Sequence, residues 1–180
     1  MRRVTRRAAS LTAVCLVLAA VSCASAQSVD SVAAGVEQLR HVVGAWDVVT
    51  GFLNADGNVA QSVKGSYTFE WVVVDKVVRG RSDTPSFNRA AGILFYVNEG
   101  KGIIEMVSVG ADGHLWVMTG PLDGETRATP PTKMPDGSTL QLRFTRYNVE
   151  RDRFESRMER TTDGGATWLP GNHQVFLRKK

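Results

Sequence analysis

The spacing of hydrophobic residues changes near residue 44, from the spacing of a helix to that of β-strands. Before this point the apolar residues recur at intervals of four, three and four, on one face of a helix. They are Val32, Val36, Leu39 and Val43. Asp30 is suited to cap the start and Gly44 to end the last turn. The pattern predicts a short amphipathic helix at about 30–43 that packs on an apolar surface.

From residue 45 onward apolar and polar residues alternate with a period of two. The clearest case is 61–74, where Tyr67, Phe69 and Trp71 share one face and Thr68 and Glu70 share the other. Similar segments follow to the end of the chain, separated by turns rich in Gly, Asp, Asn and Pro. The predicted strands are 45–53, 61–74, 77–83, 91–97, 102–109, 114–120, 124–129, 138–149, 153–161 and 173–179.

No segment between these strands is long enough for a crossover helix. About ten short strands joined by tight turns indicate an up-and-down antiparallel meander. A meander of this size gains from closing on itself, because closure removes exposed strand edges. We therefore expect an all-β barrel of about ten strands with the helix over one end.

Residues 1–26 have the features of a secretory signal peptide. Arginines at 2, 3, 6 and 7 precede a largely apolar run at 8–21, and Ala24-Ser25-Ala26 forms a small-residue cleavage site. We expect cleavage after Ala26, a single mature domain at 27–180, and a periplasmic or secreted location. Lipidation at Cys23 is the weaker alternative.

Removal of the signal changes the charge balance. Four of the 22 Lys and Arg residues lie in it and none of the 18 Asp and Glu, so the mature chain carries eighteen of each. A neutral chain gives no reason to expect a nucleic-acid partner. The membrane contact we expect is transient, through the signal peptide. Cys15 and Cys23 leave with the signal, which excludes a disulfide or a thiolate site in the mature chain.

Gly44, Trp46 and Arg178 carry a resemblance to a known superfamily. The order helix, Gly-x-Trp, meander and terminal arginine resembles the calycins, the lipocalin and fatty-acid-binding superfamily. The chain also resembles an uncharacterised bacterial secreted family with a domain of unknown function. The resemblance implies that Trp46 on the first strand packs against Arg178 on the last.

The stretch 160–168, "RTTDGGATW", resembles the Asp box that is repeated on sialidase propellers. It occurs once here, and the chain has no repeat of blade length. We interpret it as a turn in which Asp163 bonds nearby backbone N–H groups and the glycines adopt positive φ.

The titratable residues give no clear catalytic pattern. His41, His114 and His173 have no metal-ligand spacing, so no metal site is expected. No cofactor is expected either. Haem is the one group left open, because the haem-binding relative nitrobindin uses a single axial histidine and His173 is the best-placed candidate.

Glu105 lies among apolar residues, so it is either an outward-facing or ion-paired charge or a polar anchor inside the barrel. Arginines including Arg143 are its candidate partners. Four aromatic residues on different strands are candidates to converge on a lumen. The ligand-binding candidates are Trp71, Tyr96, Glu105, Trp116, Arg143 and Tyr147.

The leading functional hypothesis is non-catalytic binding of a small apolar molecule inside the barrel. One alternative is an enzyme that uses Glu105 or His114 as acid or base with an arginine clamp. Another is a structural or interaction module with a filled barrel.

Overall fold

The structure is a computed structural model that describes residues 30–111, 113–134 and 136–180. The expected signal peptide at 1–26 and the lipidation alternative at Cys23 lie outside the described residues. Within the described ranges, no helix is both long enough and apolar enough to cross a membrane.

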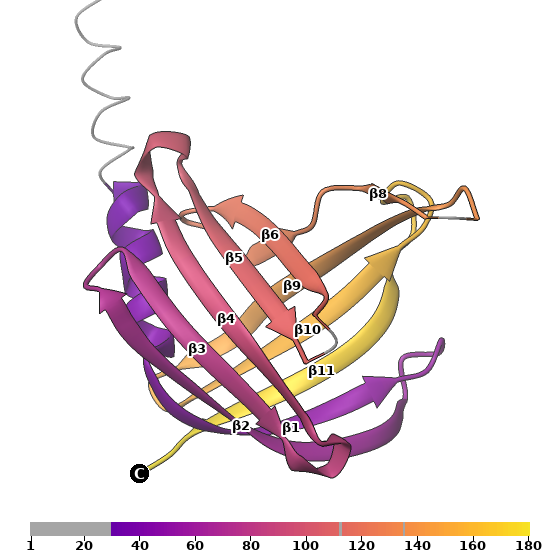
Figure 1. Cartoon of the computed structure of the whole chain (residues 1–180), viewed down its shortest axis with the longest axis horizontal. Helices are drawn as coiled ribbons and strands as arrows, with labels where there is room; N and C mark the ends of the chain where they lie inside the picture. The colour runs from indigo at the N-terminus through magenta and orange to yellow at the C-terminus, as the bar shows by residue number, and fades with distance from the viewer. Residues whose placement is uncertain (1–29, 112, 135) are drawn as a thin grey trace, which may run out of the picture.

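The described residues form a helix at 30–42 followed by eleven strands (Figure 1). The strands are β1 (Gly44–Leu53), β2 (Val59–Val73), β3 (Val77–Thr84), β4 (Arg89–Asn98), β5 (Ile103–Gly110), β6 (Leu115–Pro121), β7 (Thr126–Ala128), β8 (Thr132–Lys133), β9 (Thr139–Glu150), β10 (Arg153–Thr161) and β11 (Leu169–Arg178). Short 3-10 turns occur at Pro85–Phe87 and Glu99–Lys101.

Ten of these strands close into an antiparallel barrel. Each pairs with its neighbour in the chain, β9 follows β7 in the ring, and β11 pairs with β1 to close it. β8 pairs only with β9 and lies outside the ring. The predicted fold class, the helix and the meander order are confirmed.

Most strand boundaries lie within two residues of the predicted ones, and the larger differences concern β7, β8 and β11. The strand expected at 124–129 is reduced to the three residues of β7, and β8 was not predicted. β11 starts at Leu169 instead of 173, although its first residues include Pro170 and Gly171. A register shift between Met158 and Glu159 on β10 accommodates them.

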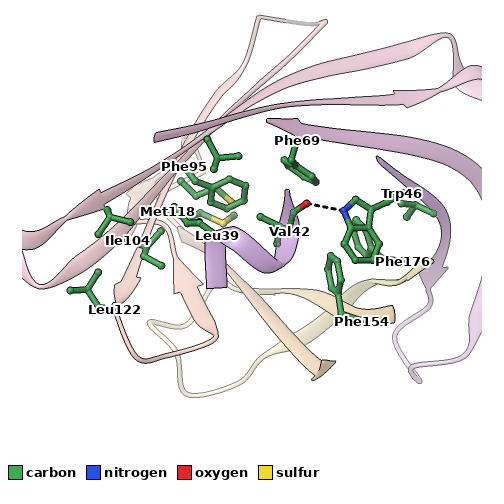
Figure 2. Packing of buried hydrophobic residues seen from close by; sticks show 14 residues of the cluster. Leu39, Val42, Trp46, Phe69, Phe95, Ile104, Met118, Leu122, Phe154 and Phe176 are labelled. Carbon is green, nitrogen blue, oxygen red and sulfur yellow. Dashed lines mark hydrogen bonds between the residues drawn. The ribbon is translucent and has the colours of Figure 1, made fainter. Parts of the chain in front are cut away.

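Side chains of alternating strand residues point into the barrel, and the helix lies over one end (Figure 1). Leu39 and Val42 of the helix belong to the hydrophobic core (Figure 2). Trp46 is fully buried, and its Nε1 donates a hydrogen bond to the Val42 carbonyl oxygen at 2.8 Å. Phe154 and Phe176 stack on each other beside it, with centroids 4.1 Å apart. The helix is thus part of the core.

Arg178 joins the helix to the first and last strands. Its guanidinium carbon lies 4.1 Å from the centroid of the Trp46 ring, and the two residues are paired in the β1–β11 register. Its Nη1 and Nη2 donate to the carbonyl oxygens of Val43 and His41 at 2.8 and 2.7 Å. These bonds satisfy carbonyl groups that the end of a helix leaves unpaired. The predicted contact between Trp46 and Arg178 is confirmed.

Because Gly44 has no side chain, the guanidinium of Arg178 can lie against its backbone. A Cβ at this position would lie 2.6 Å from Nη1 of Arg178, and the backbone φ is +130°. Any side chain at residue 44 would therefore displace the arginine and strain the backbone.

Candidate functional site

A cavity of about 200 Å³ lies between the helix and the inner face of the barrel. Its wall is mostly apolar and includes Leu39, Phe69 and Phe95, which Figure 2 shows gathered together. The volume exceeds the roughly 150 Å³ of a protein cavity that holds benzene and is below the roughly 300–1,000 Å³ of sites for drug-sized ligands. Five polar residues also line it: Gln38, Ser108, Arg127, Arg146 and Gln174.

Of the six predicted ligand-binding residues, Trp116 lines this cavity. Trp71 faces the same interior but packs against the hydrophobic core cluster outside the cavity wall. Tyr96 is 40% exposed on the outer face of β4, because it alternates with Phe95 and Val97, which are buried. The four aromatic residues therefore do not converge on the cavity.

Glu105 points away from the cavity. It alternates with the buried Ile104 and Met106, and its carboxylate accepts hydrogen bonds from Asn98 Nδ2 at 3.0 Å and Lys101 Nζ at 3.2 Å. The bond from Asn98, followed by that from Lys101, lowers the pKa of Glu105. The outward-facing alternative is confirmed, and the cavity anchor is wrong.

Arg143 and Tyr147 also lie on the outer surface, since the lining residues of β9 are Leu142, Phe144 and Arg146. Arg143 pairs with Glu159 at 2.8 Å and stacks on Trp168. Tyr147 stacks on the ring of His173, with centroids 6.2 Å apart. Neither side chain reaches a ligand in the cavity from these positions.

None of the three histidines lines the cavity. His173 lies on the outer face, with its Nε2 2.7 Å from Glu155 Oε2. The side chains bonded to Glu155, with His173 first, lower the pKa of that carboxyl to about 2. His114 is exposed against Trp116. Within the described ranges, no three His, Cys, Asp or Glu side chains are grouped as metal ligands.

Arg146 is a buried cation with a complete set of partners. Its guanidinium binds both carboxylate oxygens of Glu125, at 2.7 and 2.8 Å, and is 5% exposed. Nη1 donates to Nδ1 of His41 at 3.2 Å, while His41 Nε2 lies 2.7 Å from the Glu150 carbonyl oxygen. Since a carbonyl oxygen only accepts, Nε2 carries the proton of a neutral His41 ring.

Arg127 is also buried, with 4% exposure, but its partners are incomplete. Nη2 donates to Gln38 Oε1 at 2.7 Å, and Nε has no hydrogen-bond partner among the described residues. Burial, followed by the charge of Arg146, lowers the pKa of Arg127 to about 10, and Glu125 opposes the shift. Arg127 therefore remains a cation at neutral pH.

Gln174, another polar residue of the cavity wall, has hydrogen-bond partners for both ends of its side-chain amide. Its amide nitrogen donates to Thr50 Oγ1 and Tyr67 Oη at 3.0 and 3.2 Å, and its amide oxygen accepts from Ser156 Oγ at 3.2 Å. Arg127 differs from Gln174, because its buried Nε donor has no partner among the described residues.

The Asp-box-like stretch is a turn between β10 and β11. Thr161 Oγ1 donates to Asp163 Oδ1 at 2.6 Å, and that oxygen also accepts the Thr167 N–H at 3.0 Å. Gly164 and Gly165 have φ of 76° and 96°. These contacts confirm the interpretation as a turn, and none of its residues lines the cavity.

Comparison with known proteins identifies the fold alone. No protein-family model matches the chain, and neither does any curated protein. The crystal structure of Rv2717c from M. tuberculosis matches with a TM-score of 0.52 and 11% identity, over 81% of this chain and 98% of that one.

Two further structures match more weakly. A redesigned β-barrel, b11L5F_LGL, has a TM-score of 0.39 and 12% identity over 79% of this chain and 95% of its own. EF1p2_mFAP2b bound to DFHBI has a TM-score of 0.38 and 14% identity over 81% and 98%. What the comparisons establish is that this chain shares a barrel fold with the M. tuberculosis protein.

Proposed function

We propose that this protein binds a small, largely apolar molecule inside its barrel. The observation that carries the proposal is the cavity of about 200 Å³ beneath the helix. Its wall combines aromatic and aliphatic side chains with a few polar groups, which is the usual composition of a small-molecule site. We further propose a calycin-type binding barrel, on the arrangement of Gly44, Trp46 and Arg178.

The positions of the titratable groups favour binding over the enzymatic alternative. Glu105 and His114, the acid–base candidates, lie outside the cavity. Arg146 is held by Glu125. The cavity itself favours a binding barrel over a filled structural module. We propose a periplasmic or secreted location on the strength of residues 1–26.

Calorimetric titration with octanol, octanoate and naphthalene tests the proposal. At least one of these probes should bind with one-to-one stoichiometry. Ser108→Phe should abolish that binding because Ser108 lines the cavity. Val107→Phe is the matched control, since the neighbouring residue on β5 faces outward and should leave binding unchanged.

Two results would contradict the proposal. One is the absence of binding for all three probes. The other is undiminished binding by Ser108→Phe that circular dichroism shows to be folded, because the probe would then occupy another place.

A further inference from the structure

Arg127 brings a buried positive charge to the wall of an otherwise apolar cavity. Among the described residues, no carboxylate lies within ion-pair distance of its guanidinium. Its Nη2 donates to the neutral amide oxygen of Gln38, and the buried Nε has no acceptor in the part of the chain that the structure describes. A buried cation without a counter-charge is unfavourable unless another group pairs with it.

The neighbouring charged groups do not neutralise the charge of Arg127. Glu125 is the acidic group of this cluster, and its two oxygens are already occupied by Arg146. Two arginines and one glutamate leave one uncompensated positive charge at the cavity. His41 adds none, because the hydrogen bond from Arg146 requires its Nδ1 to be unprotonated.

We infer that the molecule held in the cavity carries one acidic group, a carboxylate, which binds Arg127 while its apolar part fills the rest of the cavity. The inference rests on the proposed binding function and defines the class of ligand. A guanidinium presents parallel N–H donors that match the two oxygens of a carboxylate. The acid would neutralise the remaining positive charge of the guanidinium.

Gln38 connects this head-group position to the helix. Its amide oxygen accepts from Arg127, and its amide nitrogen donates to the Leu122 carbonyl oxygen at 2.9 Å. The acid is therefore expected at the β7 side of the cavity, beneath residue 38 of the helix. An uncharged molecule of the same shape would leave the arginine unpaired and bind more weakly.

Calorimetric titration of the mature chain with octanoate and octanol tests the inference, because the two probes share an apolar chain and differ in the head group. Octanoate should bind at least about tenfold more tightly than octanol. Arg127→Met should remove this preference and change the affinity for octanol by less than about threefold. Arg143→Met is the matched control, since that arginine lies on the outer face, and it should keep the full preference.

Arg127→Lys provides a second variant should Arg127→Met fail to fold. It keeps the charge but loses the planar fork, so part of the preference for octanoate should remain. The melting temperature of each ligand-free variant is a further readout. If Arg127 serves the ligand, ligand-free Arg127→Met should melt at no lower temperature than the wild type. If Arg127 serves the fold, the variant should melt at a lower temperature.

Each result of the titration is decisive. Equal affinity of the wild-type chain for the two probes would overturn the inference and leave the proposed function standing. A preference for octanoate that survives in folded Arg127→Met, or is absent from Arg127→Lys, would also overturn it. Binding of neither probe, nor of naphthalene, would overturn the proposed function and the inference together.

Discussion

Trp46 and Arg178 act together at the end of the barrel where the first strand, the last strand and the helix meet. The indole is fully buried and bonded to Val42, whereas Arg178 is 26% exposed and bonded to the last carbonyl groups of the helix. Trp46→Ala should reduce the free energy of unfolding by about 3–5 kcal/mol, since it removes a large buried ring. Arg178→Ala should reduce it by about 1–2 kcal/mol through the lost stacking and hydrogen bonds.

Urea unfolding of both variants measures these losses. Arg178→Lys should retain part of the stability, because it keeps a cation over the ring. If Arg178→Ala reduces the free energy of unfolding as much as Trp46→Ala does, burial of the indole is not the main source of stability at this end of the barrel.

His41 makes the stability of this end depend on pH. Burial is the main cause that lowers its pKa, and the charges of Arg146 and Arg178 act in the same direction. The unfolded chain takes up a proton near the ordinary pKa of about 6.5, while the folded chain resists it. Stability should therefore fall as the pH drops below about 6.5, and this loss should end below the folded-state pKa.

The free energy of unfolding of wild type and His41→Gln, compared between about pH 7.5 and about pH 5, measures this contribution. The variant cannot take up the proton and should show a shallower fall over this range. The same slope in both proteins would place the pH dependence at other groups.

Strand alternation explains which candidate residues could have been placed from the sequence. Arg143 and Tyr147 alternate with Leu142 and Phe144, so their outward position could have been predicted from the face that the apolar residues share. The same rule places Arg146 inward. Glu105 could not be placed in this way, because both faces of β5 are apolar: Val107 and Val109 lie on the outer one.

Among the elements, the turn between β10 and β11 is held by Asp163 and by two glycines with positive φ. Gly165→Ala should lower the free energy of unfolding by about 1 kcal/mol, since φ of 96° is unfavourable for a residue with a Cβ. It should leave ligand binding unchanged, because the turn lies outside the cavity.

Gly92→Ala is the matched control for that variant. A Cβ at Gly92 on β4 would meet no atom within 4 Å, and its φ is not positive. Thermal unfolding should show no loss of stability for Gly92→Ala. If Gly92→Ala loses more stability than Gly165→Ala, the strain does not lie in the turn.

The strands themselves were predictable to within a few residues wherever apolar residues alternate over six or more positions. β7 was not, because the segment 124–129 contains no large apolar residue and tertiary pairing with β9 decides its length. This strand carries Arg127, and a lone arginine in a polar segment gives no sign of burial. Its importance follows from the closed barrel and the position of Gln38 on the helix.

For the whole molecule, we expect export from the cell. The mature chain should begin near Gln27, since cleavage follows a small-residue site after Ala26. N-terminal sequencing of the protein purified from its native cells measures this. A start at Met1, or a lipid-modified Cys23, would contradict the expected processing.

We propose above that the barrel holds a small molecule with an apolar body. Native mass spectrometry of the protein purified from its own cells tests this most directly. We expect a discrete one-to-one complex that loses its small component on denaturation, and no such complex for folded Ser108→Phe expressed in the same cells. Bare protein alone from the wild-type chain, or the same adduct on both proteins, would contradict it.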